Sequence, residues 1–218
     1  MNLRQLEHIV KAGEGLRLEF KRKVPEWDKL MREFVALANA KGGLVLIGVD
    51  DDGSILGVKD AREVEFEVDA AVKRHCKPQP EYSLIVLPIS RKRQVVIVDL
   101  KESREKPVLL VESPEDSKGI ALFRVKDRSI RASRELYYIL RYRQQDGNGV
   151  KFEFGEKEKQ LMEFLETHDY ITLNQFTQLA NISRNTASRT LVMLVRANVL
   201  SIHPNEKEDK YSLADGFL

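Results

Sequence analysis

Residues 44–49, Leu-Val-Leu-Ile-Gly-Val, decide how the first part of the chain is organised. A short aliphatic run closed by turn residues is typical of a buried β-strand. Gly42 and Gly43 precede the run, and residues 50–53, Asp-Asp-Asp-Gly, follow it. The Asp-Gly pair is a common hairpin turn, which predicts a returning strand over residues 54–58. The turn would place three carboxylates at the end of a buried hairpin, either as a solvated turn or as a site for a cation.

Composition sets broad limits on the class of protein. The chain has 218 residues, 42% of them hydrophobic and 32% charged, which suits a globular protein of one or two domains. A net charge of +2 is too small to indicate a nucleic-acid partner without a local cluster. The single cysteine, Cys76, excludes an intrachain disulfide and favours a reducing compartment. No stretch resembles a signal peptide or a membrane span of about 20 apolar residues, so we expect a cytoplasmic protein without membrane contact.

Hydrophobic spacing on both sides of the central run predicts an α+β domain with a mixed sheet over residues 1–145. In residues 16–21, Leu-Arg-Leu-Glu-Phe-Lys, the apolar and polar residues alternate, so Glu19 and Lys21 are expected on an exposed strand face. The predicted helices of this domain cover residues 1–11, 25–40, 61–76 and 133–142. Its further predicted strands cover residues 82–90, 94–100, 108–111 and 120–125.

A smaller second domain is predicted over residues 155–218, after a polar, glycine-bearing linker at residues 146–154. Its apolar spacing predicts three helices and then a hairpin. The helices cover residues 156–167, 172–179 and 183–197, and the hairpin strands cover residues 199–202 and 211–213. Three helices followed by a hairpin describe a winged helix-turn-helix domain.

Three stretches of the first domain form a combined pattern: residues 13–21 (Gly-Glu-Gly-Leu-Arg-Leu-Glu-Phe-Lys), residues 34–43 (Phe-Val-Ala-Leu-Ala-Asn-Ala-Lys-Gly-Gly) and residues 46–53. With residues 122–133, they resemble the Schlafen AlbA-type domain. Bacterial proteins with this domain are described as DNA-binding, transcriptional-regulator or ATP-binding proteins. The chain has no Gly-x-x-x-x-Gly-Lys-Ser/Thr loop, so we expect no ATP as a cofactor.

The resemblance also implies an alternative, catalytic function. In the nuclease members of the Schlafen group, three acidic residues form a metal-dependent site for RNA cleavage. The first two match Glu14 and Glu19, and the third matches Asp50, with Asp51 as a close alternative. Clustered carboxylates suit Mg²⁺ or Mn²⁺, and Lys21 could then hold the scissile phosphate. Charged residues on a strand face and in an Asp-Gly turn are, however, more often simply solvated.

Basic residues crowd the end of the first domain and could neutralise phosphates without reading sequence. Arg124, Arg128 and Arg131 are the candidates for nucleic-acid binding, and a solvated surface is the alternative. Their neighbours in this cluster are Lys126, Arg134, Arg141 and Arg143.

The third helix of the second domain is the stronger candidate for base recognition. Ser183 is its predicted cap, and its apolar stripe leaves an outward set of Arg184, Asn185, Ser188 and Arg189. Arginine and asparagine pair bidentately with guanine and adenine edges in the major groove. Winged helices also serve as protein-interaction modules. The hairpin tip carries more acidic than basic residues, so we expect it to contribute little to DNA binding.

Three functions follow, in order of preference. The first is a DNA-binding transcriptional regulator, with RNA as the alternative nucleic acid. The second is a metal-dependent nuclease, an endoribonuclease in reaction class, that uses the second domain to find its substrate. The third is an interaction platform in which the first domain forms a homo-oligomer and the second domain binds protein.

Overall fold

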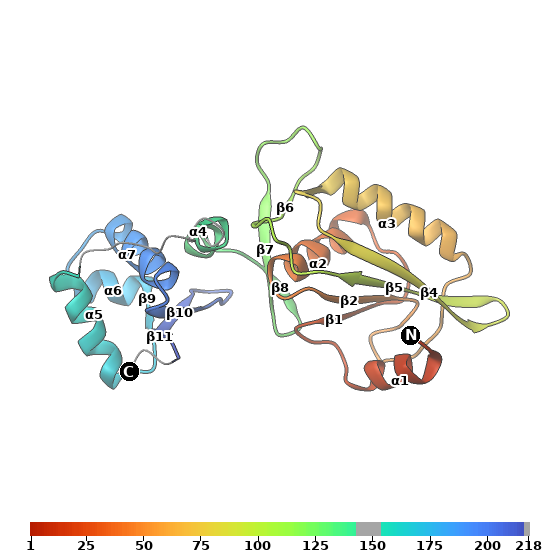
Figure 1. The fold of residues 1–218 in the computed structure, drawn as a ribbon, viewed down its shortest axis with the longest axis horizontal. Helices are drawn as coiled ribbons and strands as arrows, with labels where there is room; N and C mark the ends of the chain where they lie inside the picture. Colours follow the sequence, from red (N-terminus) through yellow and green to blue (C-terminus); the bar gives the residue numbers. More distant parts are fainter. Residues whose placement is uncertain (143–153, 216–218) are drawn as a thin grey trace. The chain divides into compact units, whose positions relative to one another are not determined.

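The computed structural model describes residues 1–142 and 154–215. It divides the chain into two compact units, Met1–Arg131 and Ala132–Leu218 (Figure 1). The chain is an α+β protein with a mixed sheet in its first unit, as the sequence predicts. Within the described ranges, no helix is long and apolar enough to cross a membrane.

The central sheet of the first unit has the strand order β1-β2-β5-β4. Strand β2 contains the aliphatic run and lies between two partners, pairing parallel with β1 and antiparallel with β5. This central position explains why the run is apolar on both faces. The strands are β1 (Leu18–Lys21), β2 (Gly43–Ile47), β4 (Tyr82–Ser90) and β5 (Arg93–Leu100).

The returning strand predicted over residues 54–58 does not form. That segment makes only isolated bridges, from Ile55 to Val49 and from Val58 to Gln94. Both edges of β2 are occupied by β1 and β5, so a hairpin partner has no edge to pair with. The chain instead turns at Gly57, whose φ of +68° favours glycine, and continues toward the start of β5.

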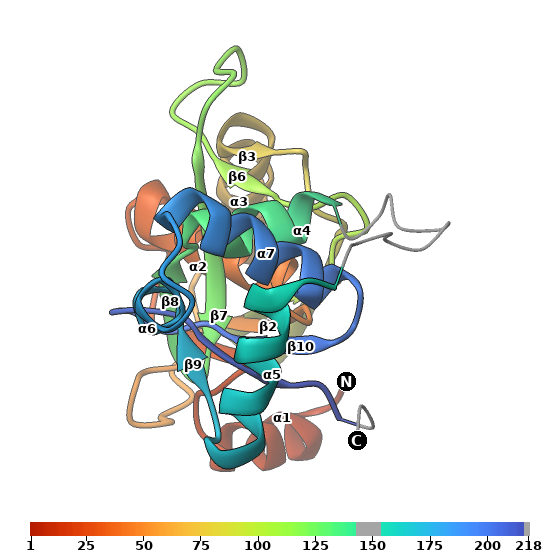
Figure 2. The same ribbon diagram turned by 90° about the vertical axis from the view of Figure 1, so that its left-hand side faces the viewer.

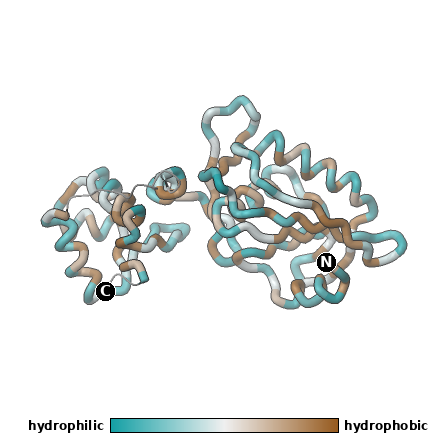
Figure 3. Tube along the Cα trace, in the orientation of Figure 1, coloured by the Kyte–Doolittle hydropathy of each residue, from teal (hydrophilic) through white to brown (hydrophobic). Residues whose placement is uncertain are grey.

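The two faces of the central sheet are covered by different helices (Figure 1). Helices α2 (Trp27–Asn39) and α3 (Ala61–His75) share a core with Val45 and Val98 on one face. Helix α1 (Leu3–Lys11) packs with Leu46 on the opposite face. Because neighbouring residues of β2 enter different cores, the strand stays buried on both sides, and Figure 3 shows the resulting hydrophobic centre of the unit.

A second, smaller sheet packs against α2, with the strand order β3-β6-β7-β8. Strand β8 is absent from the sequence prediction. It pairs antiparallel with β7 across a tight turn at Lys126, whose φ is +56°. The strands are β3 (Cys76–Lys77), β6 (Leu109–Leu110), β7 (Ile120–Val125) and β8 (Arg128–Arg131).

The second unit contains four helices and a three-stranded antiparallel sheet within its described residues. Its helices are α4 (Arg134–Tyr142), α5 (Glu156–Thr167), α6 (Leu173–Leu179) and α7 (Arg184–Arg196). Its sheet has the order β10-β11-β9, from β9 (Ile171–Thr172), β10 (Leu200–His203) and β11 (Lys210–Leu213). Phe176, Leu191 and Tyr211 lie at the centre of a core shared by helices and sheet.

Helix α4 belongs to the second unit, whereas the sequence predicts it as part of a first domain ending at residue 145. The reason is its apolar stripe: Leu136, Ile139 and Leu140 are buried, and the helix packs along α7 (Figures 1 and 2). The predicted linker at residues 146–154 lies outside the described residues except for its last residue, as does Arg143.

Candidate functional site

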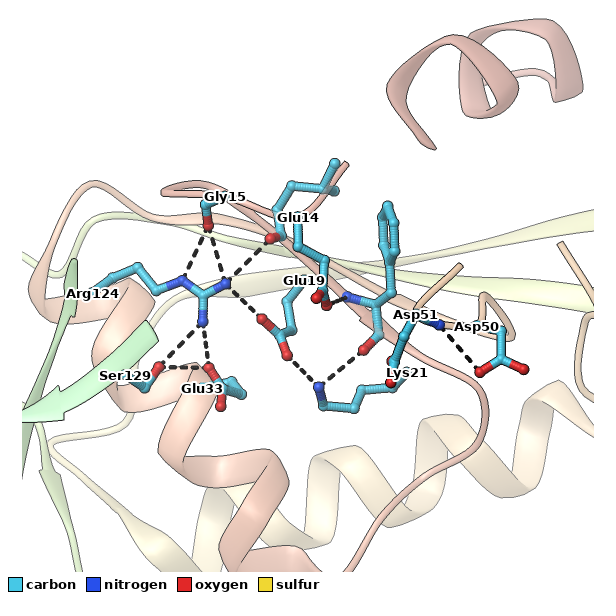
Figure 4. A network of polar contacts seen from close by, with 11 residues as sticks. Glu14, Gly15, Glu19, Lys21, Glu33, Asp50, Asp51, Arg124 and Ser129 are labelled. Atoms are coloured by element: carbon cyan, nitrogen blue, oxygen red, sulfur yellow. Dashed lines mark hydrogen bonds and ion pairs between the residues drawn. The ribbon is translucent and has the colours of Figure 1, made fainter. Parts of the chain in front are cut away.

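Arg124 lies at the centre of a buried network of charges in the first unit (Figure 4). Its Nη2 is 2.5 Å from Oε2 of Glu19 on β1, and its Nη1 is 2.6 Å from Oε2 of Glu33 on α2. Its Nε and Nη2 also donate to the carbonyl oxygen of Gly15, at 3.1 and 3.0 Å. Only 1% of Arg124 is exposed, so the prediction that it contacts phosphate is wrong: its donors already have partners.

Glu19 is also buried, although strand alternation predicted an exposed position. One carboxylate oxygen bonds to Arg124, and the other bonds to the ammonium group of Lys21. Lys21 donates a further bond to the carbonyl oxygen of Phe20, at 2.9 Å. The face that alternation assigns to solvent is covered by these partners, which come from β7 and from β1 itself.

Glu33 completes the network and was not identified from the sequence. Ser129 of β8 donates its hydroxyl to Glu33 Oε2 at 2.5 Å. Burial is the largest effect on Glu33 and raises the pKa of its carboxyl above the ordinary value of 4.5. The bonds from Ser129 and Arg124 act in the opposite direction by favouring the charged form.

Glu14 lies beside this network, and its carboxylate accepts the backbone N–H of Phe20 at 2.7 Å. Desolvation raises the pKa of Glu14, and the negative charges of Glu19 and Asp51 add to the increase. Asp51 is therefore the turn carboxylate whose charge acts on Glu14 (Figure 4).

Asp50, the preferred third ligand of the predicted metal site, pairs instead with Arg22, at 3.5 Å from its Nη1. Among the residues that the structure describes, no three Asp, Glu, His or Cys side chains form a group that could hold a metal ion. Both oxygens of Glu19 already bond to cationic side chains, those of Lys21 and Arg124. Glu14, Glu19 and Asp50 therefore do not form a preassembled metal-binding group among the described residues, and the metal site stays a prediction.

The start of α7 has the predicted cap and part of the predicted surface. The Ser183 hydroxyl accepts the backbone N–H of Thr186 at 3.2 Å. Arg184, Asn185 and Arg189 are exposed, as predicted. The first two turns of α7 therefore present two cationic side chains and one amide.

Two of these side chains are positioned by hydrogen bonds within the second unit. Arg184 donates from Nη1 to Oδ1 of Asn174 on α6, at 2.5 Å. Asn185 accepts a bond from Nη1 of Arg134 on α4, with a distance of 3.3 Å.

Ser188, the fourth member of the predicted set, is buried with 6% of its surface exposed. Its hydroxyl donates to Oε1 of Glu135 on α4 at 2.5 Å. Helix α4 covers this face of α7, so the prediction that Ser188 points outward is wrong. Val192, one turn further along, is buried as well.

The acidic hairpin after α7 has a structural role at Asp209. Burial raises the pKa of this carboxyl, which accepts a bond from the Ser133 hydroxyl and one from the backbone N–H of Asn205.

On β8 in the first unit, Arg128 and Arg131 are exposed, and they remain candidates for phosphate contact.

Comparison with known proteins identifies the first unit. The family model "Schlafen, AlbA_2" matches residues 14–133, more than half of the chain. The chain belongs to this family. The match begins at Glu14 and ends two residues after Arg131, so the Schlafen AlbA_2 domain contains the whole Arg124 network. Helix α4 begins just beyond the matched residues.

Solved structures with low sequence identity are also similar to this chain. One is the DIP2311 protein from Corynebacterium diphtheriae, at 20% identity and a TM-score of 0.42, over 68% of this chain and 29% of that one. Another is the N-terminal domain of a protein related to the ATP-dependent DNA helicase RecG, from Nitrosomonas europaea. It is 20% identical, with a TM-score of 0.43, over 61% of this chain and 94% of that one. The chain thus spans less than a third of the Corynebacterium protein, and no curated protein matches it.

Proposed function

We propose that this chain is a DNA-binding transcriptional regulator in which a winged helix-turn-helix domain follows the Schlafen AlbA_2 domain. The observation that carries the proposal is the surface at the start of α7. Arg184, Asn185 and Arg189 are exposed there, directly after the four-residue turn that follows α6. In helix-turn-helix proteins this part of the second helix contacts base edges, and arginine and asparagine are suited to guanine and adenine.

The order of elements in the second unit supports the same proposal. Helices α5, α6 and α7 are followed by the antiparallel pair β10 and β11, which would form the wing. Strand β9, between α5 and α6, adds a third strand by pairing with β11. Glu208 lies in the loop between β10 and β11, and its carboxylate accepts the backbone N–H of Asn174 at 2.9 Å. Because this loop bonds to α6, we propose that the wing supports the helices and does not itself bind DNA.

The first unit would add affinity that does not depend on sequence. Arg128 and Arg131 are exposed on β8, where their charges can neutralise phosphates.

The nuclease alternative has weaker support, because the carboxylates of the Schlafen AlbA_2 domain bond to Arg124 and Lys21 in place of a metal ion. The formation of a homo-oligomer stays a prediction.

Binding measurements on the full chain test the proposal. Fluorescence anisotropy should be measured with duplex DNA, single-stranded DNA and RNA of one sequence, over a range of salt concentrations, with Mg²⁺ and with a chelator. We expect the tightest binding to duplex DNA, weakening as salt increases. Replacing Arg128 and Arg131 by alanine should lower the slope of log affinity against log salt by about one unit per lost phosphate contact.

Arg104→Ala, at an exposed position in a loop of the same unit, is the matched control and should leave the slope unchanged. Equal affinity for all three nucleic acids, or no binding, would contradict the proposal. Mg²⁺-dependent cleavage of the RNA that is lost in Glu19→Gln would instead restore the nuclease alternative.

A further inference from the structure

Helix α4 lies along one face of α7, and its contacts extend over most of the length of that helix (Figures 1 and 2). Near the start of α7, Arg134 bonds to Asn185 and Glu135 bonds to Ser188. At the far end, the guanidinium of Arg196 lies 4.8 Å from the centre of the ring of Tyr142. The two helices therefore run side by side in the same direction.

The covered face of α7 adjoins the exposed residues Arg184, Asn185 and Arg189 that carry the proposed function. Asn185, Ser188, Val192 and Arg196 recur at helical spacing and form a single stripe on α7. The opposite face, which includes Ala187 and Leu191, packs into the core of the second unit. The stripe beneath α4 is consequently the side of α7 that the core leaves available.

A docked α4 is incompatible with deep entry of α7 into duplex DNA. The major groove is about 12 Å wide, and one α-helix with its side chains is about 10–12 Å across. Packed helices lie about 8–10 Å apart, so a pair is too wide for the groove. With α4 in place, only the exposed residues near the start of α7 can approach base edges.

Among the residues that the structure describes, helix α4 lies outside the main hydrophobic cluster of the second unit, although its own Leu136, Ile139 and Leu140 are buried. A hollow of about 460 Å³ lies between α4 and α7, with Tyr138, Arg189 and Met193 among its lining residues. Polar contacts hold the start of α4: the Ser133–Asp209 bond and the Glu135–Ser188 bond.

We infer that α4 is an internal competitor of duplex DNA for the recognition face of α7. In the closed form, α4 occupies the stripe and duplex binding is weak. In the open form, α4 has left α7, and the stripe enters the major groove. This inference rests on the proposed function, since it assigns to α7 the reading of DNA.

Hydrogen–deuterium exchange on the full chain tests the release of α4 directly. With saturating duplex DNA, we expect the amides of residues 134–142 to exchange faster than in the free protein, while α5 and α6 keep their protection. If the chain binds duplex and the amides of α4 exchange at the same rate or more slowly, the inference is overturned and the proposed function stands.

Variants of α4 test the competition from the other side. The double substitution Leu136→Gln with Ile139→Gln removes the buried apolar side chains of α4 without changing its charge. If the closed form holds about nine-tenths of the molecules, opening should tighten duplex binding about tenfold. Tyr137→Gln, at a half-buried position of the same helix, is the matched control and should not change the affinity.

Adding Arg189→Ala to the double variant should cancel the gain, because the gain must come from α7. Glu135→Ala is a milder second opening variant, in case the double variant unfolds. Fast exchange of α4 in either variant without tighter duplex binding would overturn the inference. No duplex binding by the wild type or by any opened variant would instead reject the proposed function itself.

Discussion

Arg124 joins groups from three separate parts of the first unit. It bonds to Glu19 on β1, to Glu33 on α2 and to the backbone of Gly15, and it is almost fully buried. Arg124→Ala would leave the Glu33 carboxylate without its cation and Glu19 with Lys21 alone, in a largely buried network. We expect the free energy of unfolding to fall by about 3–5 kcal/mol, measured by urea denaturation.

Arg131→Ala, at an exposed position on the neighbouring strand, is the control and should change the stability little. Equal losses in the two variants would contradict the assignment of Arg124 as the residue that compensates the buried charges.

Glu33 predicts a particular dependence of stability on pH. Burial raises the pKa of its carboxyl in the folded state above the unfolded value of about 4.5. The folded state therefore binds the proton more tightly, so this group lowers the free energy of unfolding as pH rises from 4.5 through the folded pKa. In Glu33→Gln this contribution is absent. The stability of the wild type relative to Glu33→Gln should decrease as pH rises through that window, in urea denaturation at successive pH values. A relative stability that increases over the window would contradict the raised pKa.

Individual partners at this scale could not be predicted from the sequence. Alternation along residues 16–21 assigned Glu19 to solvent, because it contains no information on a cation 105 residues away. The apolar stripe of α7 located the core but not the second covering helix, so Ser188 was placed outward. Local features were predicted correctly, among them the Ser183 cap and the exposure of Arg189.

Asn39 connects elements rather than charges. At the end of α2 it is fully buried, and its Nδ2 donates to the carbonyl oxygens of Val108, at 2.8 Å, and Leu122, at 2.9 Å. Its Oδ1 accepts the N–H of Val108 at 2.7 Å, so one side chain joins α2 to the second sheet. Asn39→Ala should lower the free energy of unfolding by at least about 1–3 kcal/mol, the cost of one unsatisfied buried backbone group. Urea denaturation with the exposed Lys41→Ala as control measures this, and a loss no larger than the control's would contradict the connecting role.

Helices and strands in which apolar residues recur at a regular spacing were predicted close to their observed bounds. Helices α2 and α7 have apolar stripes, and α7 also has a capping serine. The strand over residues 54–58 was wrong, because pairing depends on which edges of β2 are free, and these are filled by β1 and β5. Strand β9 has only two residues, and β8 (Arg-Ser-Ile-Arg) has a single apolar residue, so neither shows an apolar period.

At the scale of the whole molecule, the division of the chain follows the family domain. The Schlafen AlbA_2 match ends at residue 133, close to the boundary between Arg131 and Ala132. The sequence placed that boundary later because the polar, glycine-bearing stretch at residues 146–154 is the more obvious break. Helix α4 therefore belongs to the same unit as the proposed DNA-reading helix α7. There it can act as the inferred competitor of DNA for the surface of α7.

The central claim is that the start of α7 reads DNA sequence. The most direct measurement compares the affinity of the full chain and of Arg189→Ala for a duplex selected from random sequence and for a scrambled duplex. A bidentate arginine contact contributes about 1–3 kcal/mol of discrimination, so Arg189→Ala should weaken binding to the selected duplex by that amount and hardly affect the scrambled one. Equal losses on both duplexes, or no loss on either, would contradict the claim.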